Sequence, residues 1–207
     1  MLIKNLYQNY NSVDLCDEDG QKVVKKRFKE RFCWENETKV MGILKRNGLP
    51  VPEIVRVEYL ENTYKFIDEP DFDQTLRASP EKIDLLVELL NKFSRIRNDN
   101  FYCFSDRKDN LFKGSRKLLL ECKINLFLYN KLIAIGDGYD SKFSQFVHGD
   151  FRPANIFGEN SVDRIIDFEF SGIDDPNKDL AYLWAGAVDI DKGMIEGKVQ
   201  LLIQKGR

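Results

Sequence analysis

Residues 146–167 alternate between short apolar segments and polar turns. The first apolar segment ends at Val147, and a loop that contains a glycine and a proline follows it. Apolar residues return after this loop, turn-forming residues come next, and a second apolar segment leads to Asp167. This pattern predicts a buried strand, a loop and then a β-hairpin that brings Asn155 and Asp167 to the same edge.

The N-terminal part shows a strand pattern followed by a helix pattern. Residues 21–28 are β-branched and basic and follow turn-forming residues at 17–20, which predicts a strand. The apolar residues of segment 34–47 fall on one side of a helix, and Gly48 is placed to end it. A strand followed by a helix is therefore expected here.

Two later segments also have helical periodicity. Ser79, Pro80 and Glu81 form a helix-start signature, and apolar residues continue at helical spacing to Phe93. Residues 115–133 show the same period over a face broad enough for a buried helix. We assign both apolar faces to the core and no ligand to either.

The hairpin region carries the candidate chemistry. Transfer of the terminal phosphoryl group of a nucleotide requires a carboxylate near the acceptor hydroxyl and further oxygen ligands for magnesium. Asp150, Asn155 and Asp167 can supply that set. The alternative interpretation is a plain hairpin whose polar residues are turn formers and solvated acids.

Two motifs in this region resemble a known family. The segments HGDFRPAN at 148–155 and IDFE at 166–169 are similar to the signature of the aminoglycoside phosphotransferase and choline kinase family, distant relatives of protein kinases. The resemblance implies a two-lobed, protein-kinase-like α+β fold. Residues 1–68 would form a nucleotide-binding lobe, a small antiparallel sheet plus a helix. Residues 69–207 would form a mainly helical catalytic lobe that carries the hairpin and is short for the family.

The resemblance also implies a role for each motif position. Asp150 would be the catalytic base or would orient the acceptor hydroxyl, and Arg152 would neutralise the transferring phosphate. Asn155 and Asp167 would hold Mg²⁺ on the phosphates of ATP or GTP. His148 would support the nucleotide-binding side of the site by bonding the loop backbone, rather than by transferring protons.

The family pattern further requires a lysine on a strand and a glutamate on a helix. Lys25 and Lys26 both lie on the predicted strand, and only one can contact the phosphates because neighbouring strand residues face opposite sides. Matching the family's lysine to the segment V-V-K favours Lys25, whereas matching it to the segment K-R-F favours Lys26. Glu37 falls at the acid position of the family's helix segment and would orient the lysine.

Three other positions extend the resemblance. The phosphate-covering loop would lie within residues 6–15, where no glycine occurs, so Asn11 and Ser12 would donate to the phosphates instead. Residues 64–68 would connect the two lobes, and their backbone groups would bind the edge of a purine base. Asp179 would begin a helix and tie its N-terminus to the catalytic loop.

Composition and charge restrict the functional class. The chain has 207 residues, of which 43% are hydrophobic and 32% charged, as in one compact globular protein. No apolar run reaches the length of a membrane span, and no signal-peptide core is present, so a cytoplasmic location is expected. Four scattered cysteines and one histidine argue against a zinc site. A net charge of -2 argues against general nucleic-acid binding.

We therefore predict a kinase that moves the terminal phosphoryl group of Mg-ATP or Mg-GTP to a hydroxyl of a small molecule. Aminoglycosides, sugars and choline-like alcohols are candidate acceptors, and acidic residues at 68–73 and 174–191 would suit a polycation. One alternative is a non-catalytic nucleotide-binding module, because the loop lacks glycine and the chain ends soon after Trp184. Another is a protein or RNA kinase, because residues 25–31 are basic. The sequence leaves the oligomeric state open.

Overall fold

The computed structural model describes residues 1–8, 10–97, 100–102, 145–175 and 177–186. The helix predicted over 115–133 lies outside these residues. The described part combines helices with antiparallel sheets, which confirms the predicted α+β class. Among these residues, no helix has both the length and the apolar character needed to cross a membrane.

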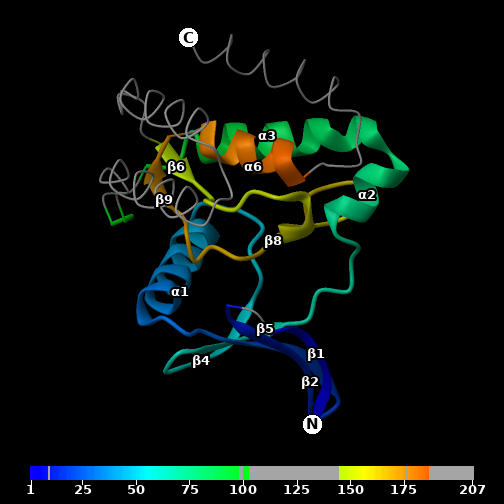
Figure 1. Cartoon of the computed structure of the whole chain (residues 1–207), viewed down its shortest axis with the longest axis vertical. Helices are drawn as coiled ribbons and strands as arrows, with labels where there is room; N and C mark the ends of the chain where they lie inside the picture. Colours follow the sequence, from blue (N-terminus) through cyan, green and yellow to red (C-terminus); the bar gives the residue numbers. More distant parts are fainter. Residues whose placement is uncertain (9, 98–99, 103–144, 176, 187–207) are drawn as a thin grey trace, which may run out of the picture.

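An antiparallel sheet of five strands forms one end of the molecule, at the bottom of Figure 1. Its order is β1-β2-β3-β5-β4, so the central strand β3 is paired on both sides. The predicted strand over 21–28 is confirmed as β3. The strands are β1 (Leu2–Gln8), β2 (Ser12–Glu18), β3 (Gln21–Arg27), β4 (Ile54–Glu58) and β5 (Glu61–Lys65).

Helix α1 (Arg31–Arg46) follows β3 and contacts β5. It begins three residues before the predicted start, and its buried residues include Val40, Met41 and Leu44, which the sequence placed on one face. The predicted stop is confirmed, because Gly48 has a left-handed φ of +73°. Backbone bonds from Gly48 to Lys45 and from Leu49 to Leu44 close the last turn.

The remaining described elements carry the two motifs at 148–155 and 166–169. Figure 1 shows α3 and α6 at the end of the molecule opposite the sheet, with β8 between them and the sheet. The predicted helix start at Ser79 is a single 3-10 turn, after which the α-helix begins. The elements are α2 (Phe72–Ala78), η1 (Pro80–Lys82), α3 (Ile83–Phe93), β6 (Gln145–Val147), η2 (Pro153–Asn155), β7 (Ile156–Phe157), β8 (Arg164–Ile165), β9 (Gly172–Asp174) and α6 (Asn177–Gly186).

The core anchors the loop between β6 and η2. Phe151 lies in that loop and is fully buried, although its neighbour Arg152 is exposed. Phe93 of α3 packs edge-on against both Phe146 and Phe151, with ring centroids 5.4 and 5.7 Å apart. Burying an aromatic ring from the loop itself fixes the loop against the helices, so its polar neighbours are held in place.

Candidate active site

The loop that begins at His148 is held by the carboxylate of Asp179 in the first turn of α6. The amide nitrogens of His148 and Gly149 donate to the two oxygens of Asp179 over 2.7 and 2.9 Å. This confirms the predicted tie between Asp179 and the loop backbone. Burial raises the pKa of Asp179 to about 6, although both backbone bonds favour the charged form.

The only histidine in the chain joins this loop to the hairpin. Its Nε2 lies 2.9 Å from the carbonyl oxygen of Ile166, and its Nδ1 accepts a bond from the amide of Asp150 over 3.2 Å. The ring is fully buried, and burial lowers the pKa of His148 to about 4. With both ring nitrogens bonded to backbone, His148 positions the loop and has no ring atom left for a nucleotide.

Gly149 allows the loop to pass close to the segment after Asp167. Its φ is +89°, and a Cβ at this position would lie 2.1 Å from the carbonyl oxygen of Phe170. The hydroxyl of Ser171 donates to the carbonyl of His148 over 2.8 Å at the same crossing. Only glycine fits this backbone without a shift.

Asp150 receives two donors from its own loop. Arg152 Nη2 and Asn155 Nδ2 both reach Oδ2 of Asp150, over 2.7 and 3.0 Å. Asn155 Nδ2 also donates to the Asp150 backbone carbonyl over 2.9 Å. Because these bonds use the nitrogen of the Asn155 amide, its Oδ1 is directed elsewhere.

The predicted hairpin is confirmed by the pairing of β7 with β8. Ile156 lies opposite Ile165, and the amide of Ile166 donates to the carbonyl of Asn155 over 2.9 Å. Asp167 follows directly, with a left-handed φ of +70° that turns the chain out of the strand. The hairpin thus holds Asn155 and Asp167 beside each other.

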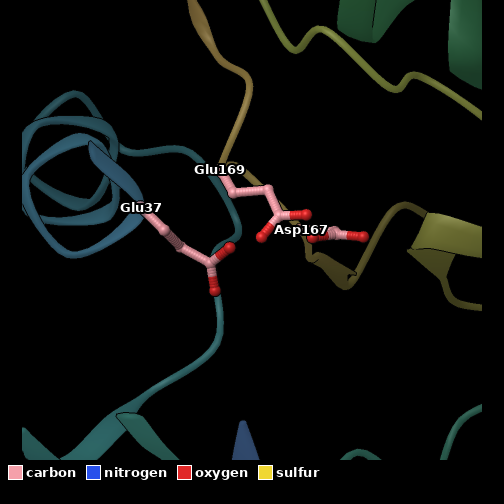
Figure 2. Close-up of side chains that lie close together, drawn as sticks. All are labelled: Glu37, Asp167 and Glu169. Atoms are coloured by element: carbon pink, nitrogen blue, oxygen red, sulfur yellow. The ribbon is translucent and has the colours of Figure 1, made fainter. Parts of the chain in front are cut away.

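Lys26 connects the sheet, α1 and the hairpin segment in one largely buried cluster. Its Nζ lies 2.7 Å from Glu37, 2.6 Å from Asp167 and 3.5 Å from Glu169. Figure 2 shows these three carboxylates converging, Glu37 from α1 and the other two from the segment after β8. Three carboxyl groups thus share one described ammonium group.

The charges in this cluster depend on one another. Burial alone would lower the pKa of Lys26, but the three carboxylates outweigh it and raise that pKa. Burial alone would raise the pKa of Asp167, but the Lys26 ammonium lowers it. Burial raises the pKa of Glu169 to about 6. Lys26 is therefore held cationic and Asp167 anionic.

The structure places Lys26 in this cluster and Lys25 outside it. Lys25 faces the other side of β3, where its ammonium lies 2.7 Å from Glu18. Ser12 is likewise on the face opposite Lys26, because it pairs with Arg27. Of the two residues expected to donate from the glycine-free loop, only Asn11 turns its side chain toward the cluster.

Several contacts at the site were not anticipated. The Asn11 amide nitrogen donates to Glu169 over 2.6 Å, and its oxygen accepts from the backbone of Lys29, which ties the β1–β2 loop to the hairpin segment. Asn36 donates to the carbonyls of Glu169 and Ser171. Glu169 belongs to the IDFE motif, but the sequence predicted no role for it. No sequence pattern indicated Asn36, because its partners are backbone groups far along the chain.

A cavity of about 240 Å³ adjoins the cluster. Lys26, Glu37 and Asp167 contribute to its lining, together with Phe66 and Ile67 of the segment after β5. Apolar side chains from the sheet and the hairpin form most of the remaining lining; they include Leu6, Val13, Val24, Phe157 and Ile166. The cavity therefore combines an apolar slot with a charged group of side chains, as small-molecule sites do.

The residues at the hairpin also fit a hard divalent cation. Asn155 Oδ1 and the Asp167 carboxylate are oxygen donors of the type that Mg²⁺ takes from proteins. One Asp167 oxygen contacts Lys26, which leaves the second for another ligand. The donor chemistry is thus compatible with the magnesium expected from the sequence.

Gly149→Ala should destabilise the protein strongly. The new Cβ would collide with the Phe170 backbone at a left-handed φ, so the free energy of unfolding should fall by at least about 2 kcal/mol in urea titrations. Gly42→Ala is the matched control, because its Cβ would meet nothing closer than 3.7 Å and helical Ala is favoured by about 1 kcal/mol. Equal stabilities of the two variants would contradict the close approach at Gly149.

The His148 imidazole should stay neutral well below its usual pKa. Because the chain has one histidine, its ring signals in an NMR pH titration are unambiguous, and we expect a midpoint near pH 4. The unfolded chain takes up this proton near pH 6.5, so His148 should make stability fall as pH drops from 6.5 toward 4. A midpoint at 6 or above in the folded protein would show that the ring is not buried as described.

The family and the fold follow from comparison with known proteins. The sequence profile of the phosphotransferase enzyme family matches residues 17–203. No curated protein sequence matches the chain. Solved structures do resemble it, but their sequence identities are low, so they establish only the fold.

Three such structures illustrate the likeness. Macrolide 2'-phosphotransferase type I has a TM-score of 0.74 and 16% identity, with 99% of this chain and 75% of that one covered. The streptomycin-ATP ternary complex of APH(2")-IIa has a TM-score of 0.62 and 19% identity, covering 86% and 68%. A choline/ethanolamine kinase family protein from Mesorhizobium loti has a TM-score of 0.70 and 15% identity, covering 93% and 66%. The protein therefore has the predicted kinase-like fold and belongs to the phosphotransferase enzyme family.

Proposed function

We propose that the protein transfers the terminal phosphoryl group of Mg-ATP or Mg-GTP to a hydroxyl of a small molecule. The observation that carries the proposal is the position of Lys26, which is ion-paired with both Glu37 and Asp167 at the edge of the cavity. This arrangement brings a fixed cation and a candidate metal ligand to one place, as phosphoryl transfer requires.

The nucleotide would bind in the cavity between two lobes, residues 1–68 and 69–207. Its base would lie against the apolar side chains of the sheet and hairpin, beside the backbone of Phe66 and Ile67. Lys26 would then contact the α- and β-phosphates, held in position by Glu37. The binding of phosphates would replace part of the contact between Lys26 and Asp167.

Asn155 and Asp167 would hold Mg²⁺. When bound there, Mg²⁺ would supply positive charge to offset that of the phosphates. The bond from Asn155 Nδ2 to Asp150 fixes the amide so that its oxygen is available to the ion. Asp167 has its pKa lowered by Lys26, so it is anionic and ready to bind metal at neutral pH.

Asp150 would orient the acceptor hydroxyl and take its proton. Its Oδ2 already accepts bonds from Arg152 and Asn155, which leaves Oδ1 for the acceptor. Arg152 is about half exposed and would move to the transferring phosphoryl group once the substrates are bound. Its present bond to Asp150 keeps the arginine close to where charge develops.

Similar structures support a small hydroxylated acceptor. One is named a macrolide phosphotransferase, another holds streptomycin and ATP, and a third belongs to a choline/ethanolamine kinase family. These names span different acceptors, so we propose the shared class, a small molecule with a free hydroxyl. The streptomycin complex contains ATP, so ATP is the first nucleotide to test.

One contact favours a second candidate, a nucleotide-binding module without catalysis. Asn11 ties the glycine-free β1–β2 loop to Glu169, which restricts the approach of that loop to the phosphates. A loop held in this way could bind nucleotide without aligning the terminal phosphate. Turnover by the wild-type protein separates this candidate from the kinase.

Asp150→Asn should strongly reduce turnover while leaving nucleotide binding intact. The protein is incubated with Mg-ATP or Mg-GTP and an acceptor panel of aminoglycosides, macrolides, sugars and choline, and nucleoside diphosphate is measured. Loss of the proton acceptor should reduce kcat by about 10² to 10⁴.

Asp19→Asn is the matched control, because Asp19 is exposed in a turn whose left-handed φ suits asparagine. Undiminished activity in Asp150→Asn would contradict the mechanism, and nucleotide-induced stabilisation without any turnover would favour the binding module.

Lys26→Met and Lys25→Met form a matched pair on the two faces of β3. Lys26→Met removes the cation shared by the acid cluster, so we expect kcat/KM for nucleotide to fall by at least about a hundredfold. Lys25→Met removes only a partly exposed ion pair with Glu18, so its kcat/KM should remain within about twofold of wild type. The reverse order of effects would assign the phosphate contact to Lys25.

A further inference from the structure

Buried polar side chains form a hydrogen-bonded chain that begins at Glu37 of the Lys26 cluster and continues through Tyr64. The Tyr64 hydroxyl donates to Oε1 of Glu37 over 2.5 Å, while Lys26 bonds the other oxygen, Oε2, over 2.7 Å. Tyr64 is 8% exposed and Glu37 is 2% exposed. Each oxygen of this carboxylate therefore bonds a different partner: Oε1 bonds Tyr64 on β5, and Oε2 bonds Lys26 on β3.

The chain continues away from the site through Asn62, which is completely buried on the same strand as Tyr64. Asn62 Nδ2 donates to the Tyr64 hydroxyl over 3.0 Å, so that oxygen accepts one bond and gives its proton to Glu37. Asn62 Oδ1 in turn accepts from Trp34 Nε1 over 3.1 Å. Each member has a defined donor or acceptor role, so the chain fixes the direction of the Tyr64 hydroxyl.

Tyr64 also lines the cavity proposed for the nucleotide. One residue therefore contributes to the cavity wall and, through its hydroxyl, holds the carboxylate that orients the phosphate lysine. We propose that Tyr64 is a positioning residue for Lys26, acting through Glu37. This inference rests on the proposed kinase function.

The physical reason lies in the freedom that Glu37 would otherwise have. A glutamate bonded at one oxygen can rotate its carboxylate about the last side-chain bond, whereas bonds at both oxygens fix it. The Lys26 ammonium is also attracted by Asp167 and Glu169, over 2.6 and 3.5 Å. If Glu37 loosens, these two acids would pull the lysine toward the metal side of the site and away from the phosphates.

Tyr64→Phe tests the hydroxyl without removing the ring. We expect kcat to fall by about tenfold, the loss typical of one hydrogen bond to a charged group, with the nucleotide KM within about twofold of wild type. Tyr64→Leu removes the ring as well, so it should raise KM in addition to lowering kcat. Thr63→Val is the matched control, because it removes a buried hydroxyl from the other face of β5 and should leave both constants unchanged.

A double-mutant cycle checks the route through Glu37. In a Glu37→Ala background, Tyr64→Phe should cause no further loss of kcat, because the carboxylate that Tyr64 holds is gone. A further loss as large as in the wild-type background would overturn the proposal, since Tyr64 would then act by another route. Thermal melting of each variant confirms that it is folded before kinetics are compared.

A measurement without nucleotide separates this inference from the proposed function. Acylation of Lys26 by an amine-reactive reagent is measured by mass spectrometry relative to Lys25, which is more exposed and serves as the internal reference. We expect the Lys26-to-Lys25 ratio to rise severalfold in Tyr64→Phe and to stay constant in Thr63→Val. If wild type turns over no nucleotide, the proposed function fails while this ratio still decides the positioning role. An unchanged ratio in folded Tyr64→Phe overturns the proposal.

Discussion

The buried ion pair between Lys26 and Glu37 is the interaction on which the site depends. Lys26 comes from the central strand of the sheet, Glu37 from α1, and Asp167 from the end of the hairpin, so one ammonium group joins three elements. A buried charge is costly unless it is paired, and breaking such a pair leaves an uncompensated charge behind. The pair therefore constrains how α1, the sheet and the hairpin segment can be arranged. It also explains why Lys26 stays cationic despite burial.

A second set of contacts holds the loop that carries Asp150, and it consists almost entirely of side chains bonded to backbone. Asp179 fixes two amides, His148 joins the loop to the hairpin, and Phe151 anchors the loop in the core. The Asp150 carboxylate itself remains only partly buried, between Arg152 and Asn155. Rigid surroundings and an accessible carboxylate are the combination that positioning a substrate hydroxyl requires.

Some local elements, namely β3, α1, α3 and the β7–β8 hairpin, were predictable because each depends on neighbouring residues. The hairpin followed from apolar segments separated by turn residues, and its pairing holds Asn155 beside Asp167. The end of α1 followed from Gly48, whereas its start was misplaced by three residues because Glu30 provides no side-chain cap to mark it. The hydrogen bonds of Asn11, Asn36 and Tyr64 were not predictable, since their partners lie far away in sequence.

The sequence by itself determined the motif residues, the family, the strand β3 with the helix α1, and the β7–β8 hairpin, because these depend on residue identity and short spacings. It could not decide which of Lys25 and Lys26 faces Glu37, because the two are adjacent and chemically identical. The tertiary structure decided this, because the pairing of β3 in the sheet and the packing of α1 set which face of the strand meets Glu37. It likewise decided that Ser12 faces away while Asn11 turns inward, since that choice depends on strand register and not on residue type.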